Sequence, residues 1–290
     1  MVQKRKWVSA NVLSQELLSV INRDHTRDVS RLNSALSLHG DGELVDIPPH
    51  IFVGNISKLN HGDCILLMGI NPRLSQNEKF ERVNINIPTK CLSAYRQSGN
   101  PKDLDDWLYF QENYFLQEER NKSHFGKFGH WFGSRWFQDT YHRYSGAKAS
   151  QMTLHNHVVE VDALQYFSKS ASIEPSRFAD LIENDPALVA NMRLIEWIID
   201  KVQPKWIQIN GKSNWTFVDR CFMDSTAISL NDGDTPKTEI MVGHARIGRR
   251  IIPVFMHKFL NMSGPQRKDE RLLISETWDN WYRNESLGAL

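Results

Sequence analysis

The sequence predicts an α/β fold, specifically a three-layer α/β/α arrangement with a short parallel sheet at its centre. Four short apolar runs support this prediction, at residues 64–69, 158–161, 206–209 and 251–256. The first run, Cys64 to Gly69, contains no polar side chain, as expected of a parallel strand that is buried on both faces. Apolar residues at helical spacing occur between the later runs. Strands that alternate with helices in this way favour a parallel sheet.

The remaining elements follow from periodicity along the chain. Apolar residues at helical spacing around 10–38 predict an N-terminal helical segment within residues 1–50. We expect a helical stretch over about 176–202 and a last amphipathic helix over about 266–282, while residues 239–247 should pair antiparallel with the final strand. The 290 residues are therefore expected to form a single domain in which 73–150 is a long insertion.

Composition narrows the class of protein. Hydrophobic residues make up 40% and charged residues 24% of the chain, as in ordinary globular proteins, and no run of eighteen apolar residues occurs. The three cysteines form no C-x-x-C pair, which suits a reducing cytoplasm and argues against structural zinc. His155 and His157 offer two metal ligands, but no third is evident nearby. We therefore expect a cytoplasmic protein with no membrane partner.

Polar residues follow all four apolar runs. Asn71 comes after the first run, Asp162 after the second, Asn210 after the third and His257 after the fourth. Ligands of open parallel sheets bind beyond the carboxyl ends of the strands, so these side chains are expected to share one site. The alternative is that each polar residue only ends its strand.

This ordered set of strand ends resembles the uracil-DNA glycosylase superfamily. Gly69-Ile70-Asn71-Pro72 resembles the Gly-x-Asn-Pro motif that follows the first core strand in its mismatch-specific and single-strand-selective branches. His257 stands where the superfamily often places the His of its second motif. Asp162 stands where many members carry a base-reading Asn, and the turn after Asn210 resembles a third family turn.

The sequence departs from the family pattern in three places. Arg73 follows Pro72 where the family has Gly, and Lys258-Phe259 follows His257 where it has Pro-Ser. About 80 residues separate the first two motifs. These departures concern the substrate and the loop after His257 more than the class of reaction.

The resemblance implies hydrolysis of the bond between a flipped base and its deoxyribose, leaving an abasic site. Asn71 would position the attacking water and His257 would donate a hydrogen bond to the departing base, with no metal or other cofactor. Phe80 is expected to stack on the flipped base. Other residues expected to line the base pocket are Gly69, Ile70, Pro72 and Asn210.

Asp162 points to cytosine as the base that is read. A carboxylate accepts from the cytosine N4 amino group, and a protonated carboxyl also donates to N3, whereas an Asn amide matches uracil. Because removal of plain cytosine would destroy the host genome, the favoured substrate is a modified cytosine of phage DNA, hydroxymethylated or glucosylated, with the insertion making room for the adduct. The alternatives are uracil or mismatch repair, a non-catalytic DNA sensor of the same fold, and an Asp162 that only caps a turn.

A basic and aromatic stretch in the insertion predicts contact with DNA. Residues 120–148 hold six Lys or Arg, three His and one acid, with aromatic residues between them. Cations neutralise phosphates and aromatic rings stack on bases. A buried helix face with cations on its exposed side is the alternative. The expected DNA contacts are Arg135, Arg143, Lys212, Lys258 and Ser263, and Leu260 with Met262 would either fill the gap left by a flipped nucleotide or pack under the last helix.

Overall fold

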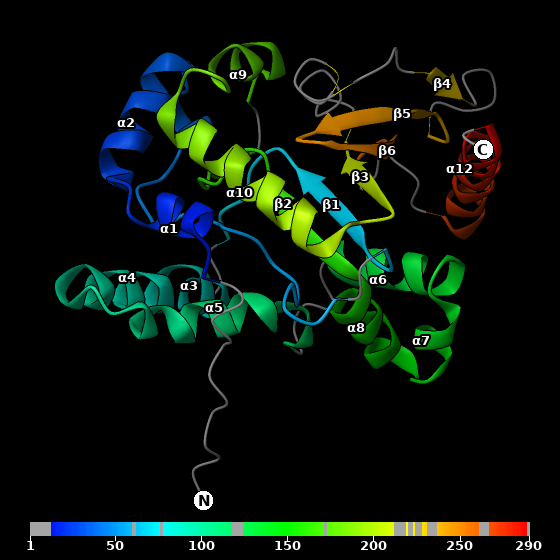
Figure 1. The fold of residues 1–290 in the computed structure, drawn as a ribbon, viewed down its shortest axis with the longest axis horizontal. Helices are drawn as coiled ribbons and strands as arrows, with labels where there is room; N and C mark the ends of the chain where they lie inside the picture. The colour runs from blue at the N-terminus through cyan, green and yellow to red at the C-terminus, as the bar shows by residue number, and fades with distance from the viewer. Residues whose placement is uncertain are drawn as a thin grey trace, which may run out of the picture.

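The computed structural model describes residues 13–59, 62–75, 78–117, 124–170, 173–211, 228–230, 237–260 and 267–288, together with Asp219 and Met223. These residues form an α/β fold around a six-stranded mixed sheet of order β2-β1-β3-β6-β5-β4 (Figure 1). The strands are β1 (Ile65–Gly69), β2 (Val158–Asp162), β3 (Trp206–Asn210), β4 (Ile228–Leu230), β5 (Ile240–Ile247) and β6 (Arg250–His257).

Four of the strands match the four apolar runs of the sequence. Strands β2, β1, β3 and β6 are parallel neighbours, which confirms the α/β class and the parallel pairing. Strand β5 runs antiparallel to β6 over the expected range. The short strand β4 then pairs antiparallel with β5 at the edge of the sheet, and no apolar run in the sequence predicts it. The sheet is therefore mixed rather than purely parallel.

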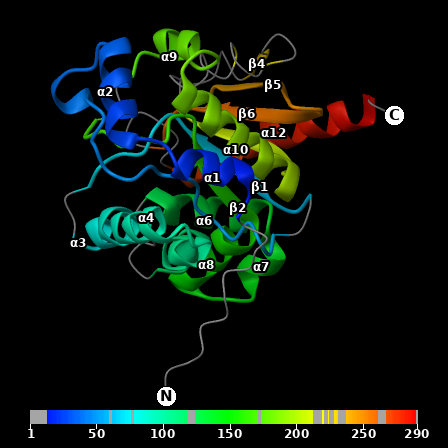
Figure 2. The same ribbon diagram turned by 60° about the vertical axis from the view of Figure 1, so that its left-hand side comes forward.

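Helices cover both faces of the sheet. Successive side chains of a strand point to opposite faces, so the apolar side chains of these strands need a covering layer on each side. Leu66 and Met68 of β1 belong to the core that includes the buried faces of α1 and α10, whereas Ile65 and Leu67 face the core beneath α6, α8 and α12. In Figure 2, α1 and α10 lie above α6 and α8. The helices are α1 (Gln15–Ile21), α2 (His25–Ala35), α3 (Glu78–Glu81), α4 (Ile87–Ser98), α5 (Asp105–Glu112), α6 (His124–Arg135), α7 (Gln138–His142), α8 (Gly146–His157), α9 (Pro175–Leu181), α10 (Pro186–Val202) and α12 (Lys268–Gly288).

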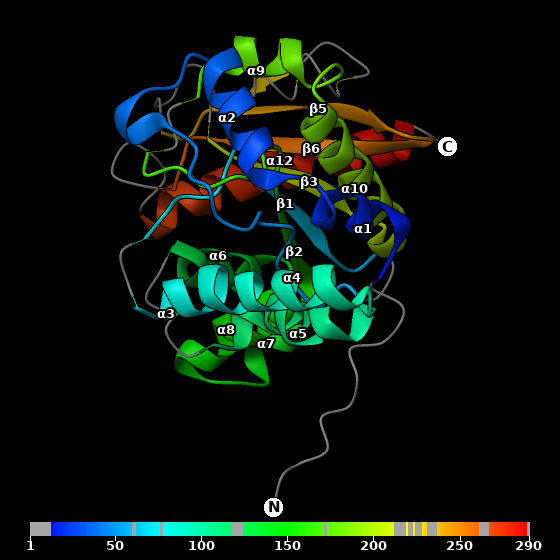
Figure 3. The ribbon, with the colours of Figure 1, turned by 90° about the vertical axis from the view of Figure 1, so that its left-hand side faces the viewer.

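The long stretch between β1 and β2 is mostly helical. It contains α3 to α8, which lie in the lower half of Figure 3. The expected helical stretch over 176–202 is two helices, because Asp185 caps a new one: its carboxylate accepts from the backbone N–H groups of Ala187 and Leu188. Within the described residues, we find no helix whose length and hydropathy would let it span a bilayer.

The segment at 50–53 pairs with the outer edge of β2. Val53 exchanges backbone hydrogen bonds of 2.8 and 2.9 Å with Glu160, and the His50 amide donates to the Gln165 carbonyl at 2.7 Å. The next residue, Gly54, has a φ of +123°, and a Cβ there would lie 2.5 Å from the Val158 carbonyl oxygen. Only glycine fits this close approach. The pairing fixes His50 beside the carboxyl end of β2.

Candidate functional site

The four parallel strands end at one rim of the sheet. Gly69 pairs with Asp162, and Asn210 pairs with His257, so the predicted strand ends are neighbours in the register. Residues in register in a parallel pair point to the same face. Five polar side chains therefore share the face that is covered by α6, α8 and α12. They are Glu160, Asp162, Gln208, Asn210 and His257.

Asn71 follows β1 and is buried, with 6% of its surface exposed. Its Nδ2 donates to the Ser168 hydroxyl at 2.8 Å and lies 3.4 Å from the Tyr166 carbonyl oxygen. The Ser168 hydroxyl itself donates to the Ser170 carbonyl at 2.7 Å, so its oxygen is an acceptor for Asn71. This chain of bonds fixes the orientation of the amide. It leaves Asn71 Oδ1 as a buried acceptor without a hydrogen bond among the described residues.

The carboxylate of Asp162 lies over Gly69 on the neighbouring strand. A Cβ at Gly69 would come within 2.2 Å of Asp162 Oδ1, so a glycine is needed for the acid to occupy this place. The backbone at the strand end is also held, because Asn191 of α10 donates to the carbonyls of Asp162 and Ala163 at 2.9 and 2.8 Å. Asp162 is 6% exposed. The acid is therefore positioned from two sides.

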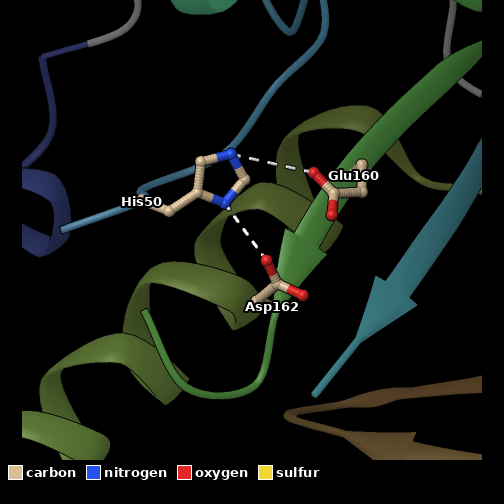
Figure 4. A group of neighbouring side chains, drawn as sticks. All are labelled: His50, Glu160 and Asp162. Atoms are coloured by element: carbon tan, nitrogen blue, oxygen red, sulfur yellow. Dashed lines mark ion pairs between the residues drawn. The ribbon is translucent and has the colours of Figure 1, made fainter. Parts of the chain in front are cut away.

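His50 lies between two acids of β2 (Figure 4). Its Nδ1 is 3.2 Å from Asp162 Oδ2, without the alignment of a hydrogen bond, and its Nε2 is 3.9 Å from Glu160 Oε2. Burial raises the pKa of Glu160 to about 8, and the charge of Asp162 adds to the effect while His50 opposes it. Strongly perturbed acids at a strand end are typical of functional sites.

Sequence reasoning missed His50 and Glu160. Glu160 interrupts an otherwise apolar run, and a charged residue in the middle of a buried strand is a signal that was available in the sequence. His50 carries no such signal, because it lies 110 positions before Glu160 and only the pairing along the edge of β2 brings them together.

The raised pKa of Glu160 predicts how stability depends on pH. Between the ordinary pKa of 4.5 and about 8, the folded state binds one more proton than the unfolded chain. The contribution of Glu160 to the free energy of unfolding is therefore fully present below pH 4.5 and is lost as pH rises through this window. Glu160→Gln should flatten the decline and be the more stable protein above pH 8, by a few kcal/mol at most. Urea unfolding of both proteins across this range measures it, and parallel pH profiles would contradict the assignment.

These three side chains are also the described residues that could together hold a metal ion. Atoms from His50, Glu160 and Asp162 lie within 4.8 Å of one another, and imidazole and carboxylates are common metal ligands. However, the two ring nitrogens of His50 face different carboxylates rather than one shared point. This arrangement fits an imidazole that bridges two acids better than a single metal centre.

Phe80 lies near this cluster through Phe167. The two rings meet edge to face with centroids 5.5 Å apart, and Phe167 meets His50 at 5.8 Å. Phe80 is buried, with 7% exposed. Phe167 therefore joins Phe80 to His50, and it lies on the segment that also holds Asn71, while stacking of Phe80 on a base stays a prediction.

His257 differs from the expectation of a side chain that faces an open pocket. It is fully buried and its ring lies 5.1 Å from that of Trp131. Its Nδ1 donates to the Lys258 carbonyl at 2.7 Å, and its Nε2 accepts from Gln208 at 3.0 Å. Gln208 is oriented by Trp206, whose indole N–H lies 3.4 Å from its Oε1. Both ring nitrogens are thus used within the protein, and donation to a base would require His257 to leave Gln208.

This geometry predicts that His257→Ala mainly destabilises the fold. The change would remove a buried ring and leave the fully buried Gln208 amide without its acceptor. We expect a loss of about 2–5 kcal/mol in the free energy of unfolding. Chemical denaturation measures the loss, and base release by the folded fraction should stay within about tenfold of wild type. A hundredfold loss of rate in folded protein would show that the ring turns to the base.

The apolar residues of the loop after β6 differ in how far they are exposed to solvent. Asn210 Oδ1 accepts from the Leu260 amide at 3.1 Å, so this side chain holds the loop instead of facing a base. Leu260 is buried in the same core cluster as Ile274 and Trp278 of the last helix, which agrees with the alternative that it packs under that helix, whereas Phe259 is 43% exposed. Lys258 is half-buried. Lys212, Met262 and Ser263, together with Arg120 and Lys122, lie outside the described residues.

Arg135 and Arg143 lie at the opposite end of the sheet from Asn71. Both line a hollow that also includes Asp63, which precedes β1, and His157, which precedes β2. Arg135 is bonded to Asp279 at 2.6 and 2.9 Å. Both arginines therefore lie away from Asn71 and Asp162, and their contact with DNA stays a prediction. Four aromatic side chains of the same stretch form a buried face, as the alternative had it: Phe128, Trp131, Phe132 and Phe137.

The chain matches no family model, and no curated protein matches its sequence. The arrangement of side chains at the rim therefore carries the functional argument.

Proposed function

We propose that this chain is a DNA glycosylase with a fold of the uracil-DNA glycosylase kind. The observation that carries the proposal is the placement of two buried groups after neighbouring strands. They are Asn71, whose Oδ1 has no hydrogen bond among the described residues, and Asp162, whose carboxylate lies over Gly69. One oriented acceptor and one acid at neighbouring strand ends are the groups that an attacking water and a departing base would need.

Asn71 is the residue that we assign to the attacking water. Cleavage of an N-glycosidic bond builds positive charge on the sugar and negative charge on the departing base. Because Ser168 holds the Asn71 amide nitrogen, Oδ1 is the atom left to accept a hydrogen bond from water and to orient it toward C1′. An amide is a weak base, so the reaction would depend on departure of the base rather than on a strong nucleophile.

Asp162 and Glu160 together suit cytosine. Burial raises the pKa of Glu160 to about 8, so this acid carries a proton at neutral pH and lies beside Asp162. The pair can therefore accept from the cytosine N4 amino group and supply a proton toward N3 as the base leaves. Uracil presents the reverse pattern, a donor at N3 beside an acceptor at O4, so it fits this pair less well.

A modified cytosine of phage DNA is the favoured substrate, since excision of plain cytosine would be lethal to the host. The proposed setting is antiviral defence in the cytoplasm, and DNA is the proposed partner. Excision of uracil or of mismatched bases in repair is the runner-up. In either case Phe259, the exposed apolar side chain of the loop after β6, is the proposed filler of the gap that a flipped nucleotide leaves.

Access to the site requires movement. Asn71 and Asp162 are each 6% exposed, and Phe80 and Phe167 are buried beside them. A base can reach the two polar groups only if a neighbouring side chain or segment gives way on binding. We therefore expect the site to close around a bound base. This closing, rather than the shape of a preformed pocket, would discriminate between bases.

The test is a screen of matched duplexes that carry uracil, a thymine mismatch, cytosine, hydroxymethylcytosine or its glucosylated form. Alkali cuts DNA wherever a base has been removed, so each substrate reports excision directly. Cleavage of the modified-cytosine strands supports the proposal, and cleavage restricted to uracil selects the repair alternative. DNA binding without cleavage of any strand would make the chain a sensor of the same fold.

A further inference from the structure

A large hollow lies at the amino ends of the parallel strands, away from the candidate site. It encloses about 920 Å³ and is lined by residues that precede β1 and β2 and by the region around α7. A strand of five residues is about 16 Å long, so the hollow and the rim that holds Asn71 are separated by roughly the height of the sheet. The hollow is of the size that holds small ligands.

Two cations at this hollow have no partner in the part of the chain that the structure describes. The side chains of Lys58 and Arg143 form neither an ion pair nor a hydrogen bond there. The acids that line the hollow balance only part of this charge. Asp63 already pairs with Lys205 at 2.9 Å, so the exposed Asp139 is the acid left to face the two cations. Arg135 is held by Asp279 from outside the lining. The unpaired charge at the hollow is therefore positive.

A buried histidine lies in the wall of the hollow. His155 lines the hollow and is 9% exposed, and its Nε2 lies 3.1 Å from Asn55 Nδ2. Burial lowers the pKa of His155 to about 4, so the ring is neutral at neutral pH. Because the amide nitrogen donates to Nε2, the ring proton is on Nδ1, which has no hydrogen-bond partner among the described residues. A buried donor of this kind is costly unless an acceptor meets it.

We propose that this hollow binds the phosphate group of a nucleotide. Phosphate oxygens are strong acceptors that suit Arg and Lys, the two kinds of unpaired cation at this hollow. The volume accommodates a mononucleotide. The same phosphate could come from a free nucleotide or from the 5′ end of a DNA strand. The inference rests on the hollow alone and stands whether or not the rim is a glycosylase site.

Isothermal titration calorimetry on the full chain tests this. The probes are inorganic phosphate, dCMP, and a short DNA strand with either a 5′-phosphate or a 5′-hydroxyl. We expect dCMP or the phosphorylated strand to bind, and the preference between them identifies the source of the phosphate. Arg143→Glu and Lys58→Glu should each weaken binding by about tenfold or more.

The matched control is Lys90→Glu, an exposed charge reversal on α4 outside the lining. Lys58 and Arg143 are exposed, so both variants should fold, and thermal melting checks that they do. Weaker binding in both hollow variants with the control unchanged supports the site. Equal binding by all three variants, or no binding of any probe at millimolar concentration, would overturn it.

Discussion

Asn71→Ala should lower the rate of base excision by about 10²- to 10⁴-fold while the protein still folds and binds DNA. The reason is that Asn71 Oδ1 is the one oriented acceptor that we assign to the attacking water, whereas the amide nitrogen is held by Ser168. Single-turnover rates on the best substrate of the duplex screen measure the effect, because they report excision separately from product release.

Asn113→Ala is the control for loss of an amide side chain outside the site. Asn113 Nδ2 donates to the Tyr109 carbonyl at 2.9 Å at the end of α5, a bond in which no residue of the rim takes part. This variant should cost about 1 kcal/mol of stability or less and leave excision unchanged. If Asn71→Ala excises at the wild-type rate, Asn71 does not position the water.

Asp162→Asn should shift the base preference from cytosine toward uracil. The amide keeps an acceptor but adds a fixed NH₂ donor, which matches the O4 and N3–H edge of uracil and opposes the N4 amino group of cytosine. A mismatch of about 1–3 kcal/mol corresponds to a loss of about 5- to 150-fold on cytosine substrates. Competition between uracil and modified-cytosine duplexes measures the preference.

Gly69→Ala tests the same carboxylate without altering it. The new Cβ would meet Asp162 Oδ1 at 2.2 Å, so the acid must move, while the strand itself can remain in place because the clash is with the end of a side chain. We expect cytosine excision to fall in this variant as it does in Asp162→Asn. A wild-type preference in both variants would mean that Asp162 does not read the base.

Much of the sheet could be predicted from the sequence because burial on both faces leaves a direct mark. The run at 64–69 has no polar residue, and it forms β1 at the centre of the parallel strands. The order of strand ends along the chain then placed Asp162 and His257 on one rim. In contrast, β4 is three residues long with exposed side chains, so periodicity carries no information about it.

The orientation of side chains at the rim could not be predicted in the same way. His257 ends its strand as expected, but the rings of α6 cover it and Gln208 occupies its Nε2. Sequence patterns also do not give the direction of a helix. The ring of Phe128 in α6 lies 6.0 Å from that of His257, whereas Arg135 at the end of α6 lies near the amino ends of the strands. The helix therefore runs away from the rim, and Arg135 lies away from the rim as well.

The most direct measurement of the central claim is the identity of the released product. A matched duplex with glucosylated hydroxymethylcytosine is incubated with the protein, and mass spectrometry is used to detect the free modified base and an abasic strand of unchanged length. We predict both products in equal amounts with wild type and their loss with Asn71→Ala. A shortened strand without free base, or no product from any base in the duplex series, would contradict it.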